Sequence, residues 1–194
     1  EDGVTIISSF VVSTTSPTSA SVMVNLQNAA SAILDAFLDL NRDGDWTDAD
    51  EQIFTNQSLS SGNNVLTFTI PQDTGVNVET GTTYARFRVS TAGGLSSTGA
   101  AADGEVEDYQ VTLTPAGGAA TVTLPPGGGT TEVLVVGGNL VVRRGGVTLL
   151  SVPAGGGGSL TINGSNADND TLLLNLGNSS VLPTGGLTVN GGTG

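Results

Sequence analysis

A run of acidic and amide side chains between residues 39 and 51 is the part of the sequence whose residue types could do chemistry. Oxygen-bearing side chains stand at every second position, and Gly44 lies where the chain must turn sharply. Hard cations such as Ca²⁺ are bound by several oxygen ligands that a short loop can supply at this spacing. We therefore expect a calcium site, and the candidate ligands in this loop are Asp39, Asn41, Asp43, Asp45, Asp50 and Glu51.

The residue that closes this loop is left open by the spacing. If Asp39 is the first position of a twelve-residue calcium loop, the twelfth position, where a bidentate Glu is expected, holds Asp50, and Glu51 follows it. Packing so many carboxylates together costs free energy unless a cation or solvent relieves the repulsion. The alternative is a solvated acidic turn, in which Asp and Asn side chains only satisfy turn backbone.

A second acidic cluster lies between residues 103 and 109. It offers three further candidate ligands, which could reach the first cluster or form a group of their own: Glu105, Glu107 and Asp108. The alternative is that these carboxylates pair with Arg86 and Arg88 on a neighbouring strand.

Composition excludes several other functions. The chain has no Cys, His or Lys, which removes Cys–His and Ser–His catalysis and zinc sites built from those residues. We expect no enzymatic activity, because paired carboxylates alone do not make a glycosidase and no substrate cleft is indicated. A net charge of −13 argues against nucleic-acid binding. No apolar run reaches the roughly 20 residues of a membrane-spanning helix.

The elements that position these clusters are predicted to be strands. Residues rich in Val, Ile, Thr and Phe alternate with Pro, Gly, Asn and Asp, which predicts an antiparallel β-sandwich. In residues 84–90 the alternation places Ala85, Phe87 and Val89 toward the core and both arginines outward. Residues 29–40 fit a helix or a strand, and we favour a strand. The expected strands are residues 5–13, 21–26, 29–40, 65–70, 84–90 and 107–113.

Composition changes near Pro115, which predicts two domains, residues 1–114 and 115–194. The first holds 15 acidic residues and 3 arginines, a net of −12, and the second holds 20 of the 29 glycines and a net charge of −1. The second domain is expected to be a Gly-rich β domain, either a β-roll, a β-helix or a stack of hairpins, with a tight turn at Gly137-Gly138. Its expected strands are residues 119–124, 132–136, 139–143, 147–152, 159–162, 171–176 and 187–189.

Two further features of this Gly-rich part carry expectations. Residues 164–172 partly match the Gly/Asp nonapeptide that binds calcium in β-rolls, and the alternative is a polar turn. The last expected strand has no capping element after it, which indicates either a cut through a longer array of repeats or free strand edges that can pair with another chain.

The first domain resembles a GEVED domain of bacterial secreted and surface proteins over roughly residues 3–113. The likeness rests on residues 39–46, 50–54, 83–90 and 93–96, and on the name-giving Gly104-Glu105-Val106-Glu107-Asp108-Tyr109. One departure is Ala36-Phe37-Leu38, where a Trp-containing strand is expected. The resemblance implies an extracellular β-sandwich without catalytic activity, in which the aspartate loop binds calcium. Residues 119–192 are similar to Gly-rich β-repeat regions of planctomycete-type surface proteins.

Together these features predict a noncatalytic, calcium-stabilised structural module outside the cell or on its surface. We expect it to be a building unit of a surface layer, filament or stalk, with self-association through exposed β edges. The alternative is an adhesin module that binds a carbohydrate or another surface, such as a cell-surface glycan. That function would need exposed aromatic side chains, for which the candidates are Trp46, Tyr84 and Tyr109.

Overall fold

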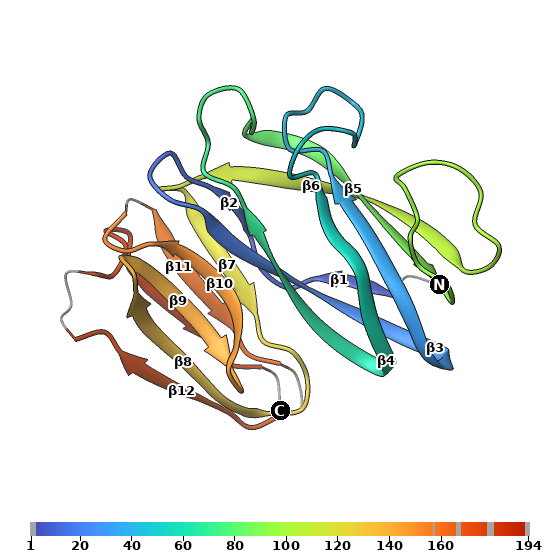
Figure 1. The fold of residues 1–194 in the computed structure, drawn as a ribbon. Coiled ribbons are helices and arrows are strands. Elements are labelled where there is room, and N and C mark those ends of the chain that lie inside the picture. The colour runs from blue at the N-terminus through green and yellow to red at the C-terminus, as the bar shows by residue number, and fades with distance from the viewer. Residues whose placement is uncertain (1–2, 157, 166–167, 178–180, 193–194) are drawn as a thin grey trace.

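Nearly all regular secondary structure in the described residues is β-strand. The computed structural model describes residues 3–156, 158–165, 168–177 and 181–192, and the fold in Figure 1 confirms the expected all-β class. None of the described residues forms a helix with the length and apolarity needed to cross a membrane. The strands are β1 (Val4–Ile6), β2 (Phe10–Val12), β3 (Thr18–Leu38), β4 (Gln52–Ile70), β5 (Gly81–Ser90), β6 (Glu105–Pro115), β7 (Ala119–Thr123), β8 (Gly129–Val136), β9 (Asn139–Arg144), β10 (Val147–Pro153), β11 (Ser159–Asn163), β12 (Asp170–Asn175) and β13 (Leu187–Asn190).

A long hairpin of β3 and β4 organises the first domain. The two strands pair antiparallel from Thr18 opposite Ile70 to Phe37 opposite Gln52, with register shifts along the way. One shift follows Leu26, near Asn28, whose φ of 59° lies in the left-handed region. Such bulges bend and twist a strand pair, which allows a long hairpin to wrap around a core.

The hairpin of β5 and β6 extends this sheet. The second half of β3 pairs with β5, and β5 pairs with β6 along its whole length. β2 adds to the far edge of β6 in parallel, and β1 pairs with the first half of β3. The result is a sandwich-like arrangement of mostly antiparallel strands.

The core of the first domain lies between these strands. It contains apolar residues of β1 to β6, and its aromatic members meet edge to face: Phe10 and Phe54 each pack on Phe68, with ring centroids 5.2 and 5.8 Å apart. Ala85 and Phe87 are buried in it as the alternation predicted. Alternate residues of each strand point toward this core, which explains the period-two pattern of these sequences.

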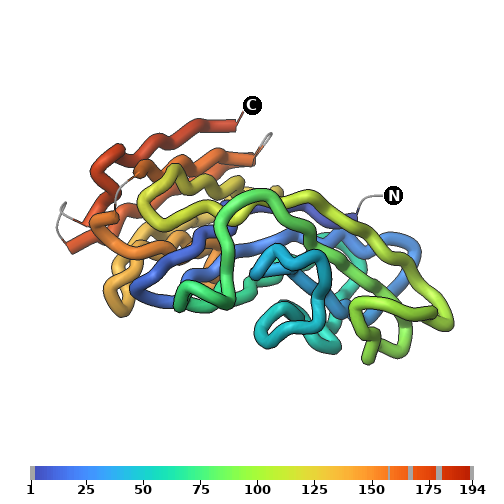
Figure 2. The backbone as a smooth tube through the Cα atoms, turned by 90° about the horizontal axis from the view of Figure 1, so that it is seen from above, coloured from blue at the N-terminus to red at the C-terminus, as the bar shows by residue number. Residues whose placement is uncertain are grey.

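The second domain stacks its strands in parallel. β7, β11 and β13 form one three-stranded sheet, and β12 stacks on β8 in the other sheet. Successive passes of the chain therefore form coils of a β-solenoid, which Figure 2 shows as layered strands. One antiparallel hairpin, β9 and β10, is inserted after β8. Of the three arrangements expected, the structure shows β-helix-like stacking, with a hairpin turn at Gly137-Gly138.

The two predicted domains share backbone pairing and packing. β10 pairs with β3 through Ser151 opposite Ser19, so one sheet runs through both parts. The core of the second part also includes Ile7 and Val11 from the N-terminal segment. Residues 7–9 bond to β7, where the amide of Ser9 donates to the carbonyl of Thr121 at 2.7 Å.

Four expectations about the first domain need correction. The strand expected at residues 5–13 is divided into β1 and β2, and the strands expected at 21–26 and 29–40 are one strand, β3. β4 begins at Gln52, far earlier than the expected start at residue 65. The first half of this strand is polar and lacks a clear alternation, so the sequence pattern did not indicate it. Arg88 does not face solvent: a loop covers it, and only 3% of its surface is exposed.

Candidate metal centre

The acidic loop between residues 39 and 51 is the tip of the β3–β4 hairpin (Figure 1). Backbone bonds fasten both of its ends to the sheet. The amide of Leu38 donates to the carbonyl of Glu51 at 2.8 Å, and the amide of Asp39 donates to the carbonyl of Tyr84 on β5 at 3.1 Å. The hydroxyl of Thr83 also donates to the carbonyl of Asp39 at 2.7 Å. A rigid sheet therefore presents the loop.

Within the loop, successive side chains cap the backbone two residues ahead. The carboxamide oxygen of Asn41 accepts from the amide of Asp43 at 3.0 Å, and Asp43 accepts from the amide of Asp45 at 3.1 Å. Asp45 accepts from the amide of Thr47 at 2.8 Å. These are the Asx turns that Asn and Asp favour. Gly44 has a φ of +95°, which glycine adopts without strain, so the sequence fits the turn it must make.

Two carboxylates of the loop are buried. Asp39 is 4% exposed and Glu51 is 1% exposed. The Oε1 atom of Glu51 accepts from the amide of Leu40 at 2.9 Å, and its Oε2 atom accepts from the amide of Asp48 at 3.2 Å. The Oδ2 atom of Asp39 accepts a long bond of 3.3 Å from the amide of Gly44. Its Oδ1 atom is buried and has no hydrogen-bond partner among the described residues.

Burial and charge both act against the ionised form of Glu51. Burial raises the pKa of Glu51 above its ordinary value of 4.5, and the nearby Asp39 carboxylate adds to this, although three backbone hydrogen bonds oppose it. A buried carboxylate oxygen without a donor costs free energy of its own. The interior of the loop therefore carries more negative charge than the protein's own donors balance.

Three more carboxylates gather at the outer side of the loop. Oxygen atoms of Asp43, Asp45 and Asp48 lie within 4.8 Å of one another, and all three residues are exposed. Asp48 was missed in the sequence because it stands at position 10 of the twelve-residue template, which uses position 9 instead. If Glu51 instead of Asp50 takes the closing twelfth position, Asp48 stands three residues before it, at the ninth position, and becomes a candidate ligand.

The structure separates the two residues that could close the loop. Glu51 points inside, where it binds the amides of Leu40 and Asp48. Asp50 is exposed, and its φ of 70° turns the backbone just before Glu51. Of the candidate ligands, Asp39 and Glu51 thus form the buried side of the loop, and Asn41, Asp43 and Asp45 belong to its turns.

The acidic residues of β6 are not brought to the loop. Glu105 stands opposite Val89, at the far end of β5. Glu107 accepts from the amide of Gly3 and from the hydroxyl of Tyr109. The carboxylate of Asp108 binds Arg86, at 2.7 and 2.6 Å from two guanidinium nitrogens. The expected alternative of arginine pairing therefore describes Asp108, whereas Glu105 and Glu107 bind neither the loop nor an arginine among the described residues.

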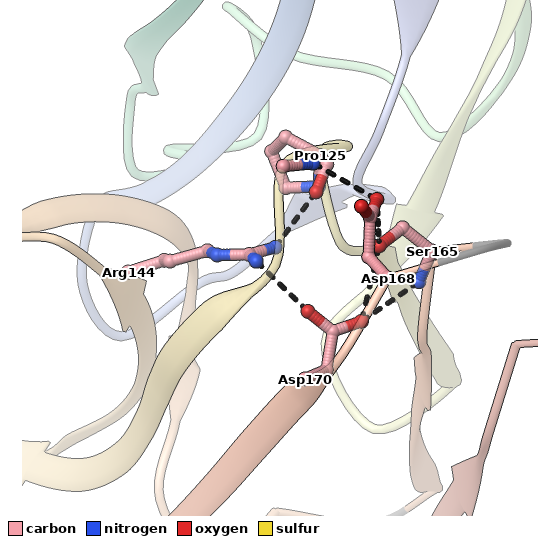
Figure 3. Close-up of polar contacts among 6 residues, drawn as sticks. Pro125, Arg144, Ser165, Asp168 and Asp170 are labelled. Carbon is pink, nitrogen blue, oxygen red and sulfur yellow. Dashed lines mark hydrogen bonds and ion pairs between the residues drawn. The ribbon is translucent and has the colours of Figure 1, made fainter.

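A second acidic pair lies in the solenoid, at the turn before β12 (Figure 3). Asp170 forms an ion pair with Arg144 at 2.8 Å and accepts from the amide of Ser165 at 2.9 Å. Asp168 accepts from the hydroxyl of Ser165 at 3.0 Å and from the amide of Gly127 at 2.9 Å. The protein itself supplies donors to these carboxylates, which fits the polar-turn alternative for this segment. Residues 166 and 167 of the nonapeptide-like stretch lie outside the described residues.

The comparison with known families supports the likeness seen in the sequence. No curated protein matches the chain. Residues 33–112, which run from the second half of β3 to β6 and include the acidic loop, match the family model described as the GEVED domain.

Proposed function

We propose that this chain is a noncatalytic structural module whose hairpin tip is stabilised by calcium. The observation that carries the proposal is the buried Oδ1 atom of Asp39, which lacks a hydrogen-bond partner among the described residues. Beside it lies Glu51, whose pKa burial and the Asp39 charge raise. A divalent cation bound between them would neutralise both carboxylates and give the Asp39 oxygen a partner.

Calcium suits this loop better than magnesium. The donors are carboxylate, amide and carbonyl oxygens, and the loop offers more of them than an octahedral magnesium ion with several retained waters needs. The candidate ligands come from one loop fastened to a sheet, which lowers the ordering cost of binding. Extracellular modules with such loops bind calcium with dissociation constants of about 10⁻⁴ to 10⁻³ M. With calcium binding we therefore also propose a location outside the cell or on its surface, where calcium is plentiful enough to fill a site of this kind.

Calorimetry tests the calcium proposal directly. At a calcium concentration about a hundredfold above the dissociation constant, binding only to the native state stabilises it by about 2.7 kcal/mol. We expect the melting temperature to rise with calcium, to fall in EDTA, and to become insensitive to both in Asp39→Asn. A melting curve of the wild-type protein that is the same in calcium and in EDTA would contradict the proposal.

We further propose that the module assembles with other copies through exposed apolar side chains of β12 and β13. One apolar side chain of each strand is exposed although its neighbour in register is buried. Val189 is 51% exposed although its neighbour in register, Ile162, is 1% exposed. Leu174 is likewise 53% exposed, and its neighbour Val133 is fully buried. A strand with the same apolar pattern would cover both side chains.

The pairing already present in the solenoid supports a second copy as that partner. β11 and β13 stack with like residues in register, and the side-chain amide of Asn190 donates to the side-chain oxygen of Asn163 at 2.8 Å. The second domain also carries a net charge of only −1, whereas the first carries −12, so two copies repel each other least at this end. The role that fits these features is a building unit of a surface layer, filament or stalk, similar to the Gly-rich repeats of surface proteins.

Sedimentation velocity tests this assembly. We expect the wild-type protein to associate with increasing concentration and Leu174→Lys with Val189→Lys to remain monomeric. Leu173→Lys is the matched control, since Leu173 is 49% exposed but stands at the outward position of Glu132. A wild-type protein that is monomeric at every concentration would contradict the proposed assembly.

The adhesin alternative has less support. Of the three aromatic candidates, Trp46 is covered by the Arg86 guanidinium at 4.3 Å, and Tyr109 packs edge to face on Phe87. Tyr84 is 50% exposed, and its hydroxyl accepts from the side-chain amide of Gln110. A glycan platform usually needs a free aromatic face, and a glycan array with the monomeric protein would detect one.

A further inference from the structure

Asp108 belongs to the acidic strand β6 but is bonded to an arginine on the next strand. It stands directly opposite Arg86 in the β5–β6 register. Its Oδ1 atom accepts from Nε of Arg86 at 2.7 Å, and its Oδ2 atom accepts from a terminal nitrogen at 2.6 Å. This bidentate bond fixes the plane of the guanidinium group, and it lowers the pKa of Asp108 and raises that of Arg86.

Arg86 in turn contacts the acidic loop through Trp46. Its guanidinium carbon lies 4.3 Å from the centroid of the indole ring, which is a cation–π contact. The indole Nε1–H donates to the carbonyl of Tyr84 at 3.2 Å. A further nitrogen of Arg86 donates to the carbonyl of Ser97 at 2.9 Å, which anchors the guanidinium group from its other side. Trp46 is therefore held between the backbone of β5 and a fixed cation.

Trp46 lies within the acidic loop, so the contact with Arg86 restrains the loop itself. Trp46 lies between Asp45 and Asp48, whose carboxylates gather with that of Asp43 at the outer side of the loop. Holding the indole ring holds the backbone that carries these carboxylates, against their mutual repulsion. Groups held in place before binding lose less conformational entropy when the ligand arrives.

We propose that Asp108 is a positioning residue of the calcium loop: it orients Arg86 over Trp46 and so tightens cation binding without touching the cation. This inference rests on the proposed calcium function. It assigns the acidic strand a role that differs from ligation, because both oxygens of Asp108 are bonded to Arg86.

Calcium titration calorimetry on four proteins tests the inference. Asp108→Asn should bind calcium about tenfold more weakly than the wild type, a usual size for coupling between two sites. Glu105→Gln is the matched control, since it removes the same charge from the same strand at an exposed position opposite Val89, and its affinity should stay within about twofold of the wild type. Arg86→Lys should also weaken binding, because lysine keeps the charge but not the planar, bidentate geometry.

A second measurement separates positioning from general stability. Trp46 is the only tryptophan in the chain, so its emission reports on the loop alone. In EDTA, the emission of Asp108→Asn should shift to longer wavelength while that of Glu105→Gln does not. Equal affinities of Asp108→Asn, Arg86→Lys and Glu105→Gln, with unshifted emission, would overturn the inference and leave the calcium proposal standing. A wild-type protein that does not bind calcium removes both.

Discussion

Asp35 and Arg88 stand directly opposite each other on β3 and β5, and the side chain of each binds backbone groups of the segment that follows β5. Asp35 is fully buried and accepts from the amides of Asn56 and Leu95 at 2.9 and 3.0 Å. Arg88 is 3% exposed and donates to three carbonyls of residues 96–99, at 2.6 to 3.0 Å. A buried anion and a buried cation thus hold the loop of residues 91–104 against the sheet.

Replacing Arg88 should therefore be costly. Arg88→Met leaves those carbonyls without their charged donor, so we expect the free energy of unfolding to fall by about 3 kcal/mol. Urea denaturation measures the change. Arg143→Met is the control, because the Arg143–Glu132 pair is about 40% exposed on both sides and an exposed pair contributes about 1 kcal/mol or less. Equal losses in the two variants would contradict the role of Arg88.

The closing residue of the acidic loop can be identified by a matched pair of substitutions. Glu51 is buried and bonded inside the loop, whereas its neighbour Asp50 is exposed. We expect Glu51→Gln to remove most of the calcium-induced rise in melting temperature and Asp50→Asn to leave most of it. Differential scanning calorimetry with and without calcium gives both values. The reverse order would show that Asp50 closes the site.

The Arg86–Asp108 pair predicts a pH dependence in the acid range. The hydrogen bond from Arg86 lowers the pKa of Asp108 below 3.8. The folded state therefore holds this proton less tightly than the unfolded state. The stabilisation is present above pH 3.8 and is lost as the pH falls through the folded-state pKa. Because Asp108 is 44% exposed, the contribution should be about 1 kcal/mol or less.

Urea titrations of the wild type and of Asp108→Asn at several pH values test this dependence. The difference in unfolding free energy should be constant near neutral pH and should shrink below pH 3.8. Both proteins are compared in EDTA, so that calcium binding does not contribute. A difference that grows as the pH falls would contradict the assignment.

Gly104, the first residue of the name-giving motif, is needed because two backbones approach closely. Its φ is +95°, and a Cβ atom there would lie 1.8 Å from the carbonyl oxygen of Val89. Gly99 is a close control, since its φ is +93° but a Cβ atom added to it would have no neighbouring atom within 4 Å. Both Ala variants carry backbone strain of about 1 to 2 kcal/mol, and only Gly104→Ala must also move β5 from β6. Urea denaturation should show the larger loss for Gly104→Ala.

Local patterns of the sequence predicted much of this fold. Alternation identified the buried face of β5, because alternate residues of a strand point to the same face. Short apolar runs separated by glycines identified the strands of the solenoid. The same reasoning missed the first half of β4, which pairs with β3 through exposed polar residues. It also placed Arg88 in solvent, since the loop that covers Arg88 comes from residues 96–99 and leaves no mark on the strand itself.

The candidate site also shows what spacing can and cannot indicate. Its candidate ligands in the loop are close in sequence, so spacing could name Asp39, Asn41, Asp43 and Asp45. The inward turn of Glu51 depends on the left-handed conformation of Asp50, and Asp50 is a residue type that accepts this conformation without requiring it. The placement of Glu105, Glu107 and Asp108 depends on the β5–β6 register, which fixes Arg86 rather than the loop as the neighbour of Asp108.

The uninterrupted course of β3 has a mechanical consequence. At its start it pairs with β10 of the solenoid through Ser19 and Ser151, and at its end it delivers Asp39 to the acidic loop. Between these points β4 holds it in antiparallel register, a geometry in which tension along the strand loads many backbone hydrogen bonds at once. Tension applied to the solenoid is therefore transmitted along β3 to the hairpin tip. A cation bound there would hold the ends of β3 and β4 together and resist their separation under load.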